Sequence, residues 1–279
     1  MTFKKLTTER TKEIIAQVAR KQLANCLECN EKMHLSKLDE NTAICSNKLC
    51  PKRRTKMSIW KNTFFHGLKI PKESALEVIE LWLQKTSINL ISYILGVSKK
   101  AVWRVLKKVS KTLVLKYYEA AEVIGGNDRI IEIDESKFGK RKYNRGHHVE
   151  GVWVLGAVEK SESRRIRLTV VDDRSMPTLT NKIKEIVKED SLIYTDCWRG
   201  YNELSSTYRA HETVNHSRHF KDPETGVHTN SIEGNWFGVK IQIPPRLRTK
   251  DKINLYLVRY MILRNEPGHP MEVILKYLF

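Results

Sequence analysis

Apolar residues recur at helical spacing in the first half of the chain and in short strand-like runs in the second half. A period close to 3.6 residues predicts an amphipathic helix over residues 8–23 and a strongly helical region over residues 71–118. After Gly125 and Gly126 the helical pattern stops and a strand pattern begins, so we place a domain boundary at this glycine pair.

Beyond the glycine pair, short runs of branched apolar residues predict strands, and longer periodic segments predict helices. The predicted strands cover residues 130–133, 152–158, 166–171, 192–194 and, more weakly, 210–215. The predicted helices cover residues 177–188, 232–241, 252–265 and 270–278. Strand, strand, strand, helix, strand, helix, strand, helix is the order expected of the ribonuclease H-like fold. In that fold the first and fourth strands are neighbours.

Charge points to a polyanionic partner. The 279 residues include 50 Lys and Arg against 32 Asp and Glu, a formal net charge of +18 that is spread along the chain. Nucleic acid is therefore the first expected partner, and an anionic membrane surface is the competing one. The longest apolar stretch, residues 88–97, is too short to cross a bilayer, and the first residues lack the features of a signal peptide. We expect no membrane association.

Four of the five cysteines lie within residues 26–50. Cys26 and Cys29 form a Cys-x-x-Cys pair, and Cys45 and Cys50 form a wider second pair. Four thiolates brought together by two turns form the closed tetrahedral shell of one structural Zn²⁺, which would supply folding energy that so small a segment lacks. The alternative is four unrelated thiols. His34 is a possible substitute ligand, although we interpret it as a surface residue.

Residues 75–109 carry the pattern of a helix-turn-helix. Two apolar helices precede the turn Gly96-Val97-Ser98, in which Ser98 can cap the helix that follows. That basic helix, residues 99–110, has the character of a major-groove recognition helix. We expect Lys99, Lys100 and Arg104 to contact DNA, mainly its phosphates. The alternative is an ordinary helical bundle with a solvated basic face.

Two acids close apolar runs and a third opens a helix. Asp134 follows the first predicted strand, Asp196 follows the fourth, and Glu233 lies at the start of a predicted helix. A carboxylate at the tip of an apolar strand is costly without a partner cation. Glu132 shares the strand face of Asp134, but the tip position favours Asp134. Three such carboxylates suit two Mg²⁺ or Mn²⁺ ions, which can cut and rejoin phosphodiester bonds.

Three sequence motifs give the chain a family resemblance: EIDESKFGKRKYNRGHH, YTDCWRGY and HTNSIEGNW. With the cysteine-rich segment and the helix-turn-helix, they resemble the transposases of Merlin DNA transposons and related bacterial insertion sequences, over residues 25–266. The resemblance implies that Asp134, Asp196 and Glu233 are the catalytic acids. It also implies recognition of terminal inverted repeats and assembly of a homodimer or higher oligomer on paired DNA ends.

Two positions depart from the relatives. An acidic residue often follows the second Asp in bacterial relatives, where this chain has Cys197. Some relatives use Asn in the third position, so Asn230 competes with Glu233; we favour Glu233 because a carboxylate binds a hard cation better than an amide does. Further basic residues are expected to contact DNA near the cut, namely Lys137, Lys140, Arg141 and Lys240.

Together these patterns predict a multidomain α+β chain. Its expected parts are an N-terminal helix (1–24), a zinc-binding ribbon (25–62), a helix-turn-helix DNA-binding domain (68–122), a ribonuclease H-like α/β catalytic domain (127–266) and a C-terminal helix (267–279). We expect a metal-dependent transposase, a polynucleotidyl transferase and endonuclease of double-stranded transposon ends and target DNA. It would work in the nucleus of a eukaryotic host or the cytoplasm (nucleoid) of a bacterial one. The alternatives are a transposase-derived DNA-binding protein without catalysis and a ribonuclease H-like nuclease that cuts without joining.

Overall fold

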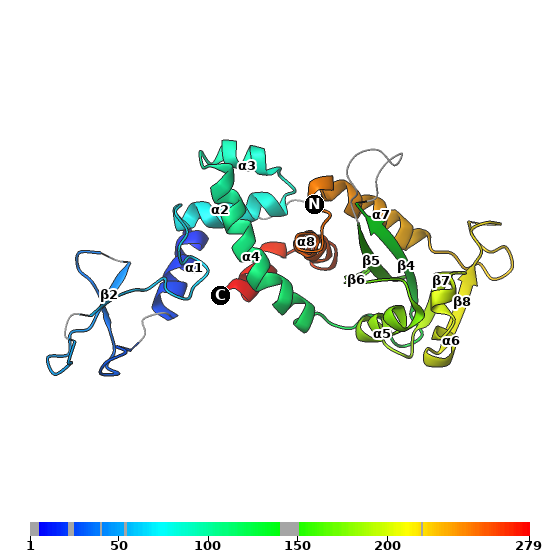
Figure 1. The fold of residues 1–279 in the computed structure, drawn as a ribbon, viewed down its shortest axis with the longest axis horizontal. Coiled ribbons are helices and arrows are strands. Elements are labelled where there is room, and N and C mark those ends of the chain that lie inside the picture. Colours follow the sequence, from blue (N-terminus) through cyan, green and yellow to red (C-terminus); the bar gives the residue numbers. More distant parts are fainter. Residues whose placement is uncertain (1–5, 22–24, 40, 53–54, 140–150, 219) are drawn as a thin grey trace. The chain divides into compact units, whose positions relative to one another are not determined.

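A computed structural model of the chain describes residues 6–21, 25–39, 41–52, 55–139, 151–218 and 220–279 (Figure 1). The chain divides into two compact units. The first contains residues 1–113 and 271–279, and the second contains residues 114–270. The glycine pair at residues 125 and 126 lies within the second unit.

The first unit combines a small sheet with helices. Its elements are α1 (Thr8–Lys21), β1 (His34–Leu35), β2 (Thr42–Ile44), β3 (Lys56–Ser58), α2 (Lys72–Leu83), α3 (Ile88–Ile94), α4 (Lys99–Ala120) and α9 (Pro270–Leu278). Strands β1, β2 and β3 form an antiparallel sheet in that order. Helix α4 crosses the division between the units, which falls after Leu113.

Helices α2 and α4 bury the apolar residues that the sequence pattern places inside, whereas α3 buries Ile88 and Ile91 and leaves Leu90, Tyr93 and Ile94 exposed. The turn before α4 is tight: Gly96 has a φ of 62°, and Ser98 Oγ accepts the backbone N–H of Ala101 at 3.2 Å. Helix α4 continues ten residues past its predicted end at residue 110. Leu113 and Tyr117 extend its buried stripe one and two turns further, so the apolar face does not stop at residue 110.

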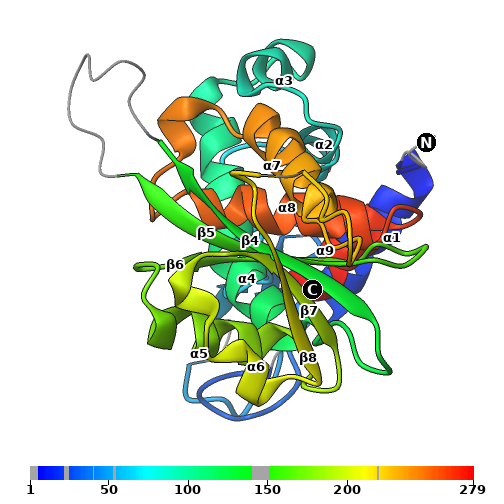
Figure 2. The same ribbon diagram turned by 90° about the vertical axis from the view of Figure 1, so that its right-hand side faces the viewer.

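The second unit is built on one five-stranded sheet. Its elements are β4 (Ile130–Phe138), β5 (Val152–Glu159), β6 (Ile166–Val171), α5 (Met176–Ile186), β7 (Leu192–Asp196), η1 (Arg199–Tyr201), α6 (Leu204–Thr207), β8 (Ala210–Val214), α7 (Asn230–Gln242), η2 (Pro245–Leu247) and α8 (Ile253–Asn265). Helices α7 and α8 cover one face of the sheet, and α5 and α6 lie on the other (Figure 2).

The strand order is β6-β5-β4-β7-β8. Strands β4, β5 and β6 pair antiparallel, whereas β7 pairs parallel with both β4 and β8. The expectation that the first and fourth strands of this region are neighbours is therefore confirmed. This arrangement supports a ribonuclease H-like region in the second unit.

Strand β4 is longer than the sequence indicates, and this corrects the predicted place of Asp134. The apolar run ends at Ile133, but β4 pairs with β5 as far as Phe138, which lies opposite Val152. Polar residues extend the strand because backbone hydrogen bonds, rather than side-chain hydrophobicity, hold the ladder together. Asp134 is thus an interior residue of β4, and its placement at the strand tip is wrong.

Two glycines let backbone segments approach closely. A Cβ atom on Gly156 of β5 would lie 2.7 Å from the indole of Trp236 and 2.8 Å from Ile232 Cδ1, so α7 sits directly on the sheet at this point. Gly125 has a φ of +88°, and a Cβ there would lie 2.3 Å from Ser191 Oγ. The glycine pair that we interpret as a boundary therefore also satisfies a packing requirement.

Candidate functional site

Asp134 and Asp196 lie on neighbouring parallel strands. The pairing of β4 with β7 runs from Ile130 with Leu192 to Glu132 with Tyr194, and Asp134 and Asp196 each lie two residues beyond its end on their own strand. The charge of Asp196 contributes to the raised pKa of Asp134, which agrees with this proximity. The structure thus brings together the first two predicted acids.

The Asp134 carboxyl group is partly buried beneath α7. Burial, reinforced by the negative charges of Glu135 and Asp196, raises its pKa to about 7, although the indole of Trp236 acts in the opposite direction. Trp236 Nε1 donates a hydrogen bond of 2.8 Å to Asp134 Oδ2. A buried acid beside a second acid is an environment that a bound cation would stabilise.

Asp196 ends β7 and organises the turn that follows. Its Oδ1 accepts the backbone N–H of Trp198 at 2.9 Å, and its main-chain oxygen accepts the hydroxyl of Thr195 at 2.7 Å. Cys197, the position that departs from the bacterial relatives, is exposed. Trp198 Nε1 donates to the main-chain oxygen of Arg174 at 3.2 Å.

Glu233 lies in the first turn of α7 with its side chain 43% exposed. Its Oε1 is 3.2 Å from His216 Nε2 and accepts the hydroxyl of Thr229 at 3.0 Å. Within the described residues, the cysteines treated below are the one set of three or more potential ligand side chains close enough to share an ion. The structure therefore does not join Glu233 to the two aspartates. Asn230, its rival, is the exposed first residue of α7.

Glu132 has a structural role that sequence reasoning missed. It is fully buried, and its carboxylate accepts the backbone N–H groups of Ser231 at 2.7 Å and Ile232 at 3.2 Å, as well as the Ser231 hydroxyl at 2.9 Å. An anion at these free N–H groups is favourable because they are the positive end of the helix. Glu132 therefore fixes α7, which carries Glu233, to the strand that carries Asp134. The signal was its place on the face of Asp134, but no local pattern identifies its partner.

The structure places one predicted basic residue at the acid pair. Lys240 Nζ lies 5.6 Å from the ring centroid of Phe138. Burial and the nearby Arg248 lower the pKa of Lys240, while the charge of Asp134 raises it. Lys137 is exposed, with Nζ 5.4 Å from the ring centroid of Trp153. The other two, Lys140 and Arg141, lie outside the described residues.

A second buried acid next to Asp134 belongs to a cluster that sequence reasoning also missed. Glu135 pairs with Arg174 Nη1 at 2.9 Å and accepts the hydroxyl of Tyr201. The Arg174 guanidinium lies 4.3 Å from the ring centroids of both Trp153 and Trp198. The Glu135 side chain is buried and that of Arg174 is 33% exposed, and their cluster supports the strand and the turn that carry the two aspartates.

The four predicted zinc ligands form a compact cluster in the first unit. The Sγ atoms of Cys26 and Cys50 are 3.8 Å apart, those of Cys29 and Cys45 are 3.7 Å apart, and all four lie within 4.8 Å of one another. A tetrahedron with Zn–S bonds of 2.3 Å has edges of about 3.8 Å. The cluster fits a zinc ion in chemistry and size. His34 is exposed on β1 and is not one of the four.

The thiols of the cluster have contrasting acidities. Backbone N–H groups of Glu28 and Cys29 donate to Cys26 and lower its pKa to about 7. Burial raises the pKa of Cys45 and raises that of Cys50 to about 12. Buried thiols of this kind become thiolates when a metal replaces their protons, which favours a closed metal site over a set of reactive cysteines.

The basic residues of α4 expected to contact DNA are all exposed: Lys99, Lys100 and Arg104. The apolar residues on the other side of α4 are fully buried, namely Val102, Val105, Leu106 and Val109. The helix thus presents a basic face to its surroundings.

The similarity to known proteins lies in the second unit. Residues 119–244, which contain all the strands of the larger sheet, match the model of the ISXO2-like transposase domain. This part of the chain is similar to that family. The matched segment contains Asp134, Asp196 and Glu233.

A curated relative points the same way. A 72-residue segment is 35% identical to a protein of Haemophilus influenzae described as an uncharacterized transposase-like protein. The matched segment covers 26% of this chain and 57% of the relative. Both comparisons support a bacterial insertion-sequence transposase, and neither supports the nuclear location expected for a eukaryotic host. Among the described residues, no helix is both long and apolar enough to cross a membrane.

Proposed function

We propose that the chain is a DNA transposase that binds transposon ends, cuts the DNA and joins the freed end to a target. The observation that carries this proposal is the pair Asp134 and Asp196, side by side on the central parallel strands of a region that matches a transposase family. Of the functions considered, it accounts best for a raised-pKa acid, a second acid and a neighbouring lysine at one place on the sheet.

Asp134, Asp196 and Glu233 are the residues that would hold two Mg²⁺ or Mn²⁺ ions. Such ions would lower the charge repulsion at the phosphodiester and activate a water or a 3′-hydroxyl for in-line displacement. Asp134 and Asp196 supply oxygen ligands from the sheet, and Glu233 supplies one from α7. To reach them, the Glu233 side chain would exchange its contacts with His216 and Thr229 for the ion. Its exposure makes that change of rotamer inexpensive.

The chain's own groups have distinct parts in this scheme. Trp236 orients the Asp134 carboxylate, Glu132 holds α7 in place, and Lys240 provides a positive charge next to Asp134 for a DNA phosphate. Lys137 extends the basic surface toward the end of β4.

The first unit would recognise the ends. We assign one structural Zn²⁺ to Cys26, Cys29, Cys45 and Cys50, and phosphate contacts to the exposed residues Lys99, Lys100 and Arg104 of α4. Double-stranded DNA is the proposed partner, and pairing of two ends would require at least two copies of the chain. Residues 25–62 and 68–122 are the proposed ribbon and helix-turn-helix, preceding a catalytic domain at residues 127–266.

The test is a strand-transfer assay with the full chain, Mg²⁺ and a duplex that carries the inverted repeats flanking the gene. We expect cleaved and joined products from the natural protein and none from Asp134→Asn, Asp196→Asn or Glu233→Gln, with DNA binding retained. The matched control is Glu185→Gln, an exposed acid of α5 paired with Lys182, which should retain activity. Cleavage without joining would indicate a nuclease, and binding without cleavage would indicate a transposase-derived DNA-binding protein.

A further inference from the structure

A basic recess of about 870 Å³ opens in the second unit, away from the acid pair. The turn between β5 and β6, the start of α7 and the end of α8 enclose it. Three cationic residues line it, Lys160 and Arg164 from the turn and Arg264 from α8. None of them belongs to the site described above.

The three cations have no acidic partner of their own. Within the described residues, no carboxylate forms an ion pair with Lys160, Arg164 or Arg264, and the buried Nε of Arg264 has no hydrogen-bond partner. Lys160 Nζ instead lies 3.0 Å from His228 Nε2. Cations that are gathered in a recess without counter-charges repel one another, so an anionic ligand would stabilise them.

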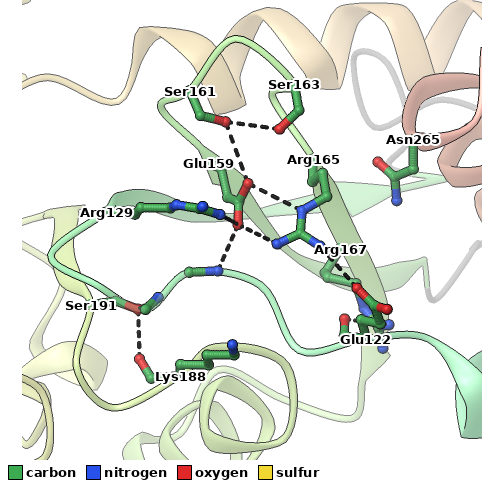
Figure 3. Close-up of polar contacts among 12 residues, drawn as sticks. Glu122, Arg129, Glu159, Ser161, Ser163, Arg165, Arg167, Lys188, Ser191 and Asn265 are labelled. Atoms are coloured by element: carbon green, nitrogen blue, oxygen red, sulfur yellow. Dashed lines mark hydrogen bonds and ion pairs between the residues drawn. The ribbon is translucent and has the colours of Figure 1, made fainter.

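The buried acid beside the recess is already neutralised. Glu159 is fully buried, and Arg165 pairs with it at 2.9 Å on one side while Arg129 lies 3.6 Å away on the other (Figure 3). The backbone N–H of Gly125 also donates to it at 2.7 Å. Glu162, on the exposed turn, is the other acid of the lining. The recess therefore keeps a net positive charge.

Neutral donors complete the lining and join it to α7. Ser161, Ser231 and Asn235 contribute polar side chains. Lys160 Nζ lies 3.0 Å from His228 Nε2, and His228 Nδ1 lies 3.3 Å from Glu132 Oε1. Since Glu132 holds the start of α7, the recess is coupled to the helix that carries Glu233.

The recess lies on the face of the sheet that carries Asp134, at a spacing that suits DNA. The backbone N–H of Lys160 bonds to the oxygen of Ile130, four residues before Asp134 on β4. A strand rises about 3.3 Å per residue, so the distance along β4 is about 13 Å. About four nucleotides of B-form DNA cover the same length.

We propose that this recess binds a phosphate group of the substrate DNA backbone, a few nucleotides from the phosphodiester that reacts. The proposal rests on the proposed transposase function and adds a positioning site to it. Lys160, Arg164 and Arg264 supply the charge, and the Ser161 hydroxyl and the second amide N–H of Asn235 supply hydrogen bonds to phosphate oxygens.

The experiment measures binding of a fluorescent DNA duplex to the full chain over a range of salt concentrations. The test variant is Lys160→Gln with Arg164→Gln, because both side chains are exposed and their loss should not disturb the fold. The matched control is Lys184→Gln with Lys188→Gln, two exposed lysines at the helical layer on the opposite face. Each lost phosphate contact lowers the slope of log affinity against log salt by about 0.9.

We expect the slope to fall by about 1 to 2 in the test variant and to change little in the control. If the slope fell equally in both variants, the recess would contribute only through the overall positive charge of the protein. If the slope did not change in the test variant, the recess would not be a DNA-binding site. Inorganic phosphate supplies the second arm of the experiment. One further result would overturn the assignment to DNA in favour of free phosphate. In it, phosphate raises the melting temperature of the natural protein but not that of the test variant, and the DNA-binding slope is the same in both.

The proposed function can fail separately. If the natural protein binds the duplex but does not cleave inverted-repeat DNA with Mg²⁺, the transposase proposal fails while the slope still reports on the recess. If cleavage occurs and is lost in Asp134→Asn, but the two double variants behave alike, the recess proposal fails alone.

Discussion

The indole Nε1 of Trp236 on α7 donates a 2.8 Å hydrogen bond to Asp134 Oδ2 on β4. One catalytic candidate is therefore oriented by the same helix that carries another, Glu233. This bond also lowers the pKa of Asp134, but burial outweighs it and leaves the value at about 7. Without a bound cation, the ionised carboxylate of Asp134 is a cost to the folded state.

The first prediction concerns the dependence of stability on pH without divalent cations. Folded Asp134 has a pKa of about 7 against an ordinary value of 3.8, so between these pH values the folded protein holds a proton that the unfolded chain has lost. Its contribution to stability therefore falls as pH rises through that window. Asp134→Asn carries no charge and should exceed the natural protein in unfolding free energy by roughly 1 to 3 kcal/mol at pH 8. Near pH 4 the two should agree, as urea unfolding in magnesium-free buffer can measure.

The control for this experiment is Asp173, an exposed acid whose pKa is lowered by hydrogen bonds from Ser175. A lowered pKa contributes stability above the ordinary value and loses it as pH falls. The unfolding free energy of Asp173→Asn relative to that of the natural protein should therefore rise as pH falls, which is the opposite of the trend expected for Asp134→Asn. A difference between Asp134→Asn and the natural protein that does not change with pH would contradict the environment assigned to Asp134.

The second prediction concerns the contact between α7 and the sheet. Gly156→Ala places a methyl group 2.7 Å from the Trp236 indole and 2.8 Å from Ile232 Cδ1, closer than van der Waals contact allows, and it should lower the unfolding free energy by about 1 to 3 kcal/mol. Gly234→Ala on α7 is the control, because a Cβ there meets nothing within 4 Å. It should raise the unfolding free energy by about 0.5 to 1 kcal/mol, since alanine favours a helix over glycine. Equal effects in urea unfolding would contradict the packing described.

The third prediction concerns Glu132. Glu132→Ala leaves the N–H groups of Ser231 and Ile232 without their acceptor and should cost about 2 to 4 kcal/mol of unfolding free energy. Glu132→Gln keeps one oxygen acceptor and the side-chain shape, so it should cost less. Chemical denaturation measures both, and hydrogen exchange at residues 231 and 232 reports the local loss. If Glu132→Ala were as stable as the natural protein, Glu132 would not fix the start of α7.

The fourth prediction concerns the cysteine cluster. The purified protein should contain one zinc per chain, and Cys50→Ser should lose it, because a hydroxyl is a poor zinc ligand beside three thiolates. Cys197→Ser is the control, since Cys197 is exposed and outside the cluster. Elemental analysis measures the zinc, and proteolysis within residues 25–62 reports the loss of local structure. Zinc retained at one per chain in Cys50→Ser would contradict the assignment of this ligand.

Helices and central strands were predictable because their apolar periodicity is local. Val102 and Leu106 on α4, and Ile193 on β7, are buried as their spacing indicates. The end of β4 was not predictable in this way. Glu135 and Ser136 look like residues beyond a strand, yet Arg174 and Tyr201 make a buried Glu135 acceptable, and both are distant in the sequence.

The candidate site was predictable in the same uneven way. Adjacent parallel strands follow from the fold order, so the sequence alone was enough to place Asp134 and Asp196 on neighbouring strands. The role of Glu132 depends on where α7 begins in space, and strand periodicity supplies only the face on which it lies. The order of strands and helices predicts that Glu233 lies at the start of a helix near the two aspartates. Its contacts with His216 and Thr229 depend on side-chain geometry, which the sequence pattern does not give.

The tight contact at Gly156 bears on how copies of such a gene are read. A single nucleotide change converts a glycine codon to an alanine codon, and at position 156 the added methyl group would displace the helix that carries Glu233 and Trp236. Such a copy would retain every acidic residue proposed here and still encode an impaired protein. An inventory of intact acids would therefore overcount the working members of the family in a genome, unless the small residue beneath α7 is counted with them.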